Sequence, residues 1–233
     1  MIVAERKPLD EIRETIAPFK KVLVLACGSC VTVCLTGGEK QAEELASQLR
    51  LAAKRDGEDL VVDVDTITRQ CDREFFENLD RSPAEYDAVL SMACGVGVGY
   101  MSEQFPDTPI LPALNTTFYG ANTAPGEFEE YCYGCGDCVL ALTGGICPVA
   151  RCSKSLANGA CGGTNEGKCE VKADMDCAWA KIYERLKARG QLDTLRPLRP
   201  VTDWRKERGA GVRRLTHAEM ADLEDDTEGE TSE

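Results

Sequence analysis

The sequence predicts an α/β protein: a small parallel sheet with flanking helices, followed by a Cys-rich domain made mostly of loops. Two observations lead to this prediction. Through the first half of the chain, apolar runs of strand length alternate with amphipathic runs of helix length, which is typical of parallel strands joined by right-handed crossovers. Eight of the thirteen cysteines then lie between residues 131 and 179, where glycine is frequent and large apolar side chains are few. We therefore expect a parallel α/β domain at 1–125, a ferredoxin-like metal-binding domain at 126–204 and a flexible charged tail at 205–233.

Hydrophobic periodicity predicts where the helices lie. A helix is expected at 8–20, since Pro8 favours a helix start, and a longer amphipathic helix at 38–54. A short helix is expected at 73–79, and a glycine-rich turn at 95–99 precedes another that ends near residue 105. In the second half, Asp174 is expected to cap a helix that carries Cys177 on its first turn and ends at Gly190.

Apolar runs predict the strands of the sheet. They lie at 21–26, 60–67, 87–92 and 108–114. Their nearly continuous apolar character is typical of parallel strands that are buried on both faces.

Composition excludes several classes of function. The net charge of −13 argues against nucleic-acid binding, which requires basic surfaces. The single histidine, His217, lies in a polar stretch, so histidine acid–base catalysis, histidine metal sites and Ser-His-Asp triads are excluded. No basic start followed by an apolar run predicts an export signal, and no apolar run reaches membrane-spanning length. We expect a cytoplasmic protein whose cysteines bind metal rather than form disulfides.

The cysteine spacing in the second half favours an iron–sulfur cluster. Cys132, Cys135 and Cys138 form a C-x2-C-x2-C triplet, which can place three thiolates around one cluster. Ferredoxins take the fourth thiolate from a distant Cys followed by Pro, and Cys147-Pro148 has that form. Structural zinc sites more often pair two short Cys knuckles or combine Cys with His. Zinc and disulfides remain alternatives for this segment.

The other five cysteines are expected at one edge of the sheet. Cys27, Cys71 and Cys94 each follow a predicted strand, and the carboxyl ends of parallel strands share the edge where ligands bind. Cys30 and Cys34 follow Cys27 closely, so these three can hold one cluster, with Cys94 or Cys71 as the fourth ligand. We favour Cys94, because the glycines after it let backbone amides approach the cluster. The alternative is a set of buried thiols without metal, since Cys is often buried.

Motifs distributed over residues 1–204 form a recognisable set. They include KKVLVLACGSCVTVC at 20–34, ACGVGV at 93–98, PALNTT at 112–117, LTGGICP at 142–148, NGACGGT at 158–164 and DCAW at 176–179. This set resembles the small iron–sulfur subunit of acetogen-type methylenetetrahydrofolate reductase, also described as the C-terminal domain family of that enzyme. The last thirty residues or so depart from the family pattern.

The resemblance implies a division of labour between subunits. A separate flavoprotein subunit would bind FAD and methylenetetrahydrofolate and perform the hydride step, so no catalytic residue is expected here. This chain would relay electrons to it through [4Fe-4S] clusters from a donor such as ferredoxin or a heterodisulfide-reductase-like module. Family members are also associated with zinc, which leaves the metal at each site open.

Thirteen cysteines allow three four-ligand sites with one thiol left over. We assign Cys27, Cys30, Cys34 and Cys94 to one cluster. A second is expected on Cys132, Cys135 and Cys138, with Cys177 or Cys147 as the fourth ligand. The third site, either a cluster or a tetrahedral zinc, is expected on Cys147, Cys152, Cys161 and Cys169. Cys71 is provisionally the thiol left over.

Two other functions are compatible with parts of the sequence. A zinc-stapled structural or interaction subunit of the same enzyme would use the same cysteines without moving electrons. A nucleotide-binding domain would use the glycines at 95–99, although they do not fit the G-x-G-x-x-G fingerprint or a Walker loop.

Overall fold

The chain divides into two compact units, Met1–Tyr133 (unit 1) and Gly134–Glu233 (unit 2). In this computed structural model, the described residues are 1–206, 212–215 and 217. The domain boundary predicted after residue 125 lies in the turn of a hairpin of unit 1, between β6 (Leu114–Ala124) and β7 (Glu127–Cys132).

Unit 1 is built around a parallel sheet of four strands in the order β3-β2-β4-β5. The strands are β2 (Lys21–Cys27), β3 (Val61–Ile67), β4 (Ala88–Ser91) and β5 (Ile110–Pro112). In β2, Val22 pairs with Val62 on one side and with Ala88 on the other, and the strand is buried from Val22 to Cys27. Such complete burial is typical of a central parallel strand that is covered on both faces. The predicted α/β class, with a parallel sheet flanked by helices, is confirmed.

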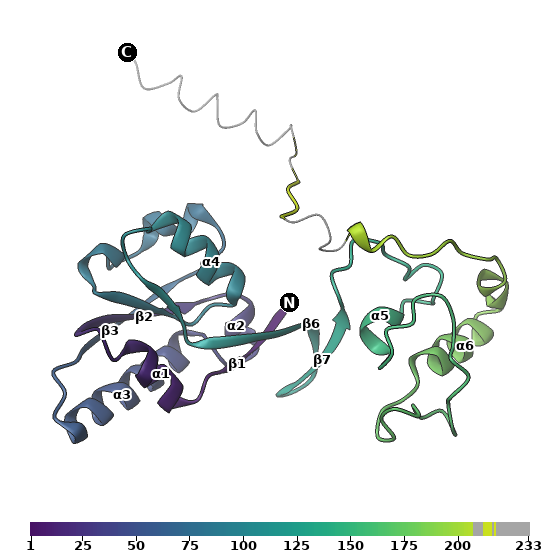
Figure 1. Ribbon diagram of the computed structural model, residues 1–233, viewed down its shortest axis with the longest axis horizontal. Helices are drawn as coiled ribbons and strands as arrows, with labels where there is room; N and C mark the ends of the chain where they lie inside the picture. Colours follow the sequence, from purple (N-terminus) through teal and green to yellow (C-terminus); the bar gives the residue numbers. More distant parts are fainter. Residues whose placement is uncertain (207–211, 216, 218–233) are drawn as a thin grey trace, which may run out of the picture. The chain divides into compact units, whose positions relative to one another are not determined.

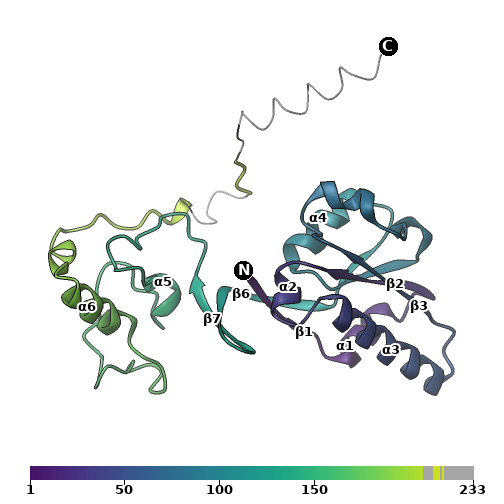
Figure 2. The ribbon, with the colours of Figure 1, turned by 180° about the vertical axis from the view of Figure 1, so that it is seen from behind.

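Helices cover both faces of this sheet (Figures 1 and 2). On one face, Val22 and Val24 of β2 pack in a hydrophobic cluster with residues of α1 (Leu9–Ile16) and α3 (Glu39–Asp56). On the other face, Leu23 and Leu25 pack with Met101 of α4 (Gly95–Gln104). The 3-10 helices η1 (Arg73–Asn78) and η2 (Pro83–Glu85) lie between β3 and β4 in the chain, and Phe75 and Phe76 of η1 pack against this second cluster. Neighbouring residues of β2 thus serve opposite layers, because side chains alternate across a strand.

The glycines at 95–99 are helical, which corrects the predicted glycine-rich turn. Helix α4 begins at Gly95, directly after Cys94. A Cβ atom at Gly97 would lie 2.7 Å from Cβ of Ala93 and 3.0 Å from Cβ of Gln70. The glycine therefore allows the first turns of α4 to approach the end of the sheet closely.

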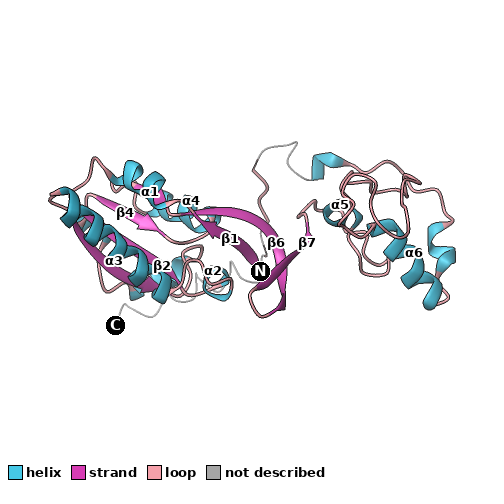
Figure 3. Cartoon of the chain, turned by 90° about the horizontal axis from the view of Figure 1, so that it is seen from below, coloured by secondary structure: helices cyan, strands magenta, loops and turns pink. Residues whose placement is uncertain are grey.

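Unit 1 also contains an antiparallel sheet that the sequence analysis did not predict. β1 (Ile2–Arg6) pairs with β6, and β6 pairs with β7 in a hairpin (Figure 3). Ile2 is the partner of Tyr119, far away in the sequence, and most side chains of β6 are exposed. Hydrophobic periodicity does not reveal β6 and β7, because neither face of these two strands is strongly apolar.

Unit 2 has short helical elements joined by long loops (Figure 1). Its helices are α5 (Pro148–Arg151) and α6 (Ala178–Ala188), and its 3-10 helices are η3 (Leu192–Leu195) and η4 (Trp204–Lys206). Its hydrophobic cluster contains Ile146 and three residues of α6, Trp179, Ile182 and Leu186. The helix predicted after Asp174 is present, but Cys177 occupies its N-cap position.

Candidate metal-binding sites

Four cysteines of unit 1 lie at the carboxyl ends of its parallel strands. Cys27 is the last residue of β2, Cys94 lies between β4 and α4, and Cys71 follows β3 in the next loop. Cys30 begins the short helix α2 (Cys30–Val33) after β2. Cys27 and Cys94 are buried, Cys30 is half-buried and Cys71 is exposed. The topology therefore brings these four thiols to one edge of the sheet.

A buried glutamine ties these strand ends together. The Gln70 side chain is fully buried, and its Nε2 donates to the carbonyl oxygens of Leu25 at 3.0 Å and Ala26 at 3.1 Å. Its Oε1 accepts a hydrogen bond from Ser91 Oγ at 2.6 Å. Because Gln70 precedes Cys71, these bonds hold the Cys71 loop against β2 and β4. The sequence analysis missed Gln70 and Ser91, since nothing in the sequence marks these polar residues as buried.

The four thiols also influence one another electrostatically. Burial raises the pKa of the Cys27 thiol, and the nearby thiols of Cys94 and Cys30 raise it further, against hydrogen bonds from backbone N–H groups. Partial shielding from water raises the pKa of Cys71, and the thiols of Cys94 and Cys27 add to the effect. Several thiolates this close together disfavour one another, and a bound cationic centre would remove that penalty.

Cys34 has different surroundings. Its Sγ lies 3.1 Å from Thr36 Oγ1, and it donates to the carbonyl oxygens of Val31 at 3.6 Å and Ala4 at 3.9 Å. The polar partners of this buried thiol are therefore a hydroxyl group and backbone oxygens of the surrounding fold.

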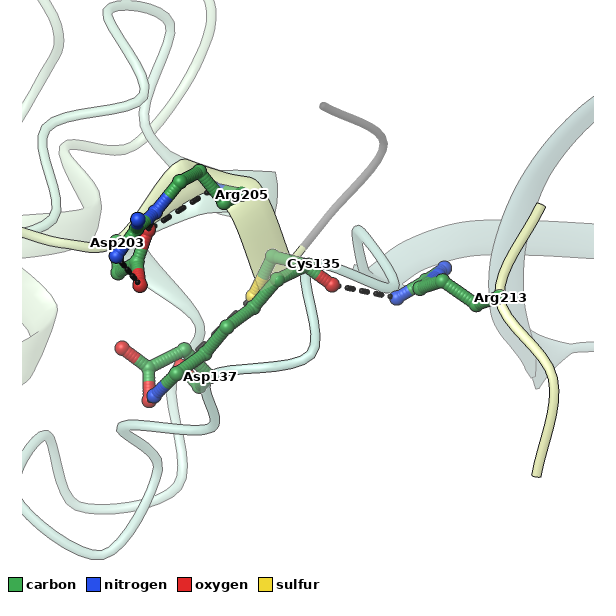
Figure 4. Close-up of polar contacts among 6 residues, drawn as sticks. Cys135, Asp137, Asp203, Arg205 and Arg213 are labelled. Carbon is green, nitrogen blue, oxygen red and sulfur yellow. Dashed lines mark hydrogen bonds and ion pairs between the residues drawn. The ribbon is translucent and has the colours of Figure 1, made fainter. Parts of the chain in front are cut away.

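The Cys132–Cys138 triplet spans the boundary between the two units. Cys132 is the last residue of β7, whereas Cys135 and Cys138 lie in a loop of unit 2. Gly134 and Gly136 have φ angles of 70° and 81°, which residues with a side chain rarely adopt. In this loop, Cys135 Sγ donates to the carbonyl oxygen of Asp137 at 3.8 Å (Figure 4). The two glycines thus allow the tight turns on which the triplet spacing depends.

Basic residues near the end of the described chain lie against the same loop. Lys206 Nζ donates to Asp137 Oδ1 at 3.2 Å. Arg213, labelled in Figure 4, donates from Nη1 to the carbonyl oxygen of Lys206 at 3.0 Å. The same nitrogen donates to the carbonyl oxygen of Gly134 at 3.5 Å. A Cβ atom at Gly136 would lie 2.8 Å from the Lys206 oxygen, so glycine is needed at this contact. Part of the predicted charged tail therefore contacts the cysteine loop, while 207–211, 216 and 218–233 lie outside the described residues.

Four cysteines of unit 2 line one pocket of about 380 Å³. They are Cys152, Cys161, Cys169 and Cys177. Cys147 is not among the lining residues; it occupies the N-cap position of α5, and its carbonyl oxygen accepts a hydrogen bond from Arg151 N at 2.9 Å. The structure thus gathers a set of four that differs by one member from the set expected from spacing.

One of the pocket thiols is set up to ionise. Ser153 Oγ lies 3.5 Å from Cys169 Sγ. Hydrogen bonding to Ser153 and to the backbone N–H groups of Val171 and Lys172 lowers the pKa of the Cys169 thiol. The thiolate is the form that binds metal, so these contacts favour a ligand role.

All thirteen cysteines lie among the described residues, and none of them forms a disulfide. Within that part of the chain, no three Cys, His, Asp or Glu side chains are gathered closely enough to hold a single metal ion. The described residues also form no helix with the length and apolar character needed to cross a membrane.

Comparison with known proteins finds a matching family model for the second half of the chain. Residues 111–205 match a family model described as "Methylene-tetrahydrofolate reductase C terminal". The matched stretch is less than half of the 233-residue chain, but it contains the cysteine triplet and all residues that line the pocket. No curated protein and no solved structure matches the chain. The family match confirms the resemblance inferred from the motifs and relates this protein to methylenetetrahydrofolate reductases.

Proposed function

We propose that this chain is an iron–sulfur electron-transfer subunit of a methylenetetrahydrofolate reductase complex. It receives electrons from a donor protein, either ferredoxin or a heterodisulfide-reductase-like module. It passes them to the FAD of a flavoprotein subunit that reduces methylenetetrahydrofolate to methyltetrahydrofolate. The family match supports the choice of enzyme, and the grouped thiols support the cofactor.

The observation that carries the proposal is the convergence of four thiols at the carboxyl edge of the sheet in unit 1. Thiolates select soft metals and iron–sulfur clusters, and a four-iron cluster takes four of them. Cys27, Cys30, Cys71 and Cys94 would hold the N-terminal cluster, with Cys71 in the place that spacing assigns to Cys34. Bound clusters supply one-electron acceptance and release, chemistry that no side chain of this protein offers.

The surrounding residues shape this site. Gln70 holds the Cys71 loop in place, and burial shields the Cys27 and Cys94 thiols from water, whereas Cys71 is exposed. Backbone N–H groups of Gln70 and Ser29 hydrogen-bond to Cys27. Hydrogen bonds to ligand sulfurs and exclusion of solvent are the means by which a protein sets the potential of a cluster.

The test is metal analysis and electron delivery by the full chain, purified without oxygen together with its flavoprotein partner. The Cys94→Ser variant should lose about four iron atoms per chain. It should slow methylenetetrahydrofolate reduction with the protein donor, while activity with an artificial donor to the flavin is kept. Ser102→Ala is the matched control in α4, the helix that begins directly after Cys94, because Ser102 Oγ donates to the carbonyl oxygen of Val98 within that helix.

Two results would contradict the proposal. Zinc in place of iron at every site would make the chain a structural subunit. Equal loss of activity with protein and artificial donors in Cys94→Ser would show that the thiol supports the fold of the complex rather than the path of the electrons.

A further inference from the structure

The loops at the thiol edge of unit 1 form a surface without charged side chains. Asp, Glu, Lys and Arg make up 29% of the chain, but segments 28–36, 95–99 and 115–117 contain none of them. Most residues of these segments are exposed or half-buried, so burial does not explain the missing charges. The exposed and half-buried residues of the three segments are referred to below as the uncharged surface.

Direct contacts join the three segments. The turn after the first segment packs on the end of β4, since Cys27 N donates to the carbonyl oxygen of Gly37 at 2.9 Å and a Cβ atom at Gly37 would collide with the carbonyl oxygen of Met92. Gly95 N donates to Thr116 Oγ1 at 2.8 Å, which joins the second segment to the third. The uncharged surface is therefore one feature at the carboxyl ends of β2 and β4, beside the thiols of the proposed N-terminal cluster.

Large apolar side chains of the uncharged surface are open to solvent. Val33 at the end of α2 is 54% exposed, Leu35 after it is 63% exposed, and Val96 in the first turn of α4 is 55% exposed. Single exposed apolar residues are ordinary on a protein surface. Three of them in segments without charge, at the edge where the thiols gather, are typical of a surface that binds another protein.

The backbone of Leu35 has a conformation that a leucine does not favour. Its φ angle is 58°, in the left-handed region that residues other than glycine rarely adopt. Leu35 N donates to the carbonyl oxygen of Thr32 at 3.0 Å, and Thr36 N donates to that of Val31 at 3.0 Å, so the turn after α2 fixes this conformation. Because the side chain is exposed, packing within the chain does little to offset the strain. A strained, exposed apolar residue points to a contact outside this chain.

The absence of charge distinguishes a permanent subunit from a diffusing electron donor. A donor that binds and leaves in every reaction cycle depends on opposite charges for fast association. The uncharged surface offers none, and in the neighbouring Cys71 loop Arg69 and Asp72 pair with each other at 3.3 Å. A partner's charge buried here would lose its water without gaining a counter-charge. Permanent subunit interfaces are more apolar, so the surface that complements this one is uncharged and belongs to a subunit that stays bound.

We propose that the uncharged surface binds the flavoprotein subunit through an uncharged, apolar surface of that subunit. This inference rests on the proposed function for the existence of the flavoprotein partner, and it adds where that partner binds. The electron donor then binds at a different surface of the chain. The thiols at the edge of the sheet are accordingly the ones that pass electrons to the flavin.

Charges placed on the uncharged surface should weaken binding without disturbing the metal content. Val33→Glu and Val96→Glu should each raise the Kd for the flavoprotein subunit about 30-fold or more, the effect of losing a central interface contact. Leu51→Glu is the matched control and should leave the Kd unchanged, because Leu51 is 69% exposed on α3, outside the uncharged surface. Titration calorimetry with the full chain, purified without oxygen, measures the Kd, and iron analysis should give the wild-type value for all three variants.

A substitution of the strained leucine separates binding from folding. Asn adopts the left-handed conformation more readily than Leu, so Leu35→Asn should keep or slightly raise the melting temperature of the chain alone. Its Kd for the flavoprotein subunit should rise, because the exposed apolar side chain is lost. A purely structural role of Leu35 would instead lower the melting temperature and leave the Kd unchanged, which would overturn the inference.

The inference is also overturned if Val33→Glu and Val96→Glu bind the flavoprotein subunit as tightly as wild type does. Loss of donor binding in these variants would then assign the surface to the donor. Conversion of a dimer into monomers in size-exclusion chromatography would assign it to a second copy of this chain. If the wild-type chain itself does not bind the flavoprotein subunit, the proposed function fails and this inference fails with it, so the two failures are distinguishable.

Discussion

Unit 1 and unit 2 are stabilised in different ways. In unit 1, helices bury both faces of the parallel sheet, and β2 contributes side chains to the hydrophobic cluster on each side. In unit 2, the hydrophobic cluster among the described residues has four buried members, three of them on α6. Burial of one apolar side chain contributes about 1.5–3 kcal/mol, while ordering the backbone costs about 1–2 kcal/mol per residue. A core of this size cannot stabilise long loops by itself.

The cysteines follow the same division. Cys27, Cys34 and Cys94 belong to a large hydrophobic cluster of unit 1, so a metal site there is added to a fold that already has a core. The pocket thiols of unit 2 connect loops that have few apolar contacts of their own. Metal binding can itself supply folding free energy to such a segment. Under the proposed function, the thiols of unit 1 would serve electron transfer alone, whereas those of unit 2 would also stabilise the fold.

Metal removal should have the largest effect on protection from hydrogen exchange. Equal loss of protection in both units would contradict the difference between them described above. After chelation without oxygen, we expect the backbone amides of α6 and the pocket loops to lose their protection from hydrogen exchange. The amides of β2, β3 and β4 should keep theirs, because their core does not include metal. Hydrogen exchange followed by mass spectrometry of the full chain measures both units in one sample.

Loss of a single thiol ligand in unit 1 should lower the iron content strongly but change the stability of that unit only slightly. Cys71→Ser is expected to lose about four iron atoms per chain while the melting temperature of unit 1 stays nearly unchanged. Cys34→Ser is the matched control and should keep its iron, because the Cys34 thiol bonds Thr36 and backbone oxygens. If Cys34→Ser loses iron and Cys71→Ser does not, the ligand set expected from spacing is correct.

Substitution of the buried glutamine should have a moderate effect on unit 1. Gln70→Ala removes hydrogen bonds to Leu25, Ala26 and Ser91 in a buried site, and leaving such groups unsatisfied costs about 1–3 kcal/mol. Urea unfolding measures this cost, and iron analysis shows whether Cys71 is still held in place. Gln104→Ala, at the exposed end of α4, should change neither quantity. An unchanged free energy of unfolding in Gln70→Ala would show that the strand ends are held by packing alone.

The smallest effect concerns a surface ion-pair cluster of unit 1. Hydrogen bonds from Arg55, and then from Arg13, lower the pKa of Asp56 to about 2, from an ordinary value of 3.8. Because the pKa of the folded state is the lower one, Asp56 stabilises the protein above pH 3.8, and this contribution is lost as the pH falls through about 2. In metal-free protein, Asp56→Asn should therefore melt slightly below wild type at pH 6 and together with it near pH 2. A difference in melting temperature that persisted near pH 2 would exclude ionisation of Asp56 as its cause.

The sequence by itself determined the elements whose signal is local. The apolar runs of β2 and β3 and the helical spacing of α3 and α6 predict those elements closely, because burial on a sheet or against a core requires that pattern. The density and spacing of the cysteines, with a single histidine, likewise determined that thiols are the candidate ligands. The matching family model confirms the resemblance that the motifs of the second half show.

Only the tertiary structure decided which distant residues come together. Pairing of β1 with β6, burial of Gln70 and the helical state of Gly97 all depend on neighbours that lie far away in the sequence or in other elements. The same holds for the thiols: spacing allows Cys147 in the third set, whereas the loops place Cys177 at the pocket. Ligand identity depends on distance in space, and a Cys-rich chain with flexible glycines permits many groupings until the fold selects one.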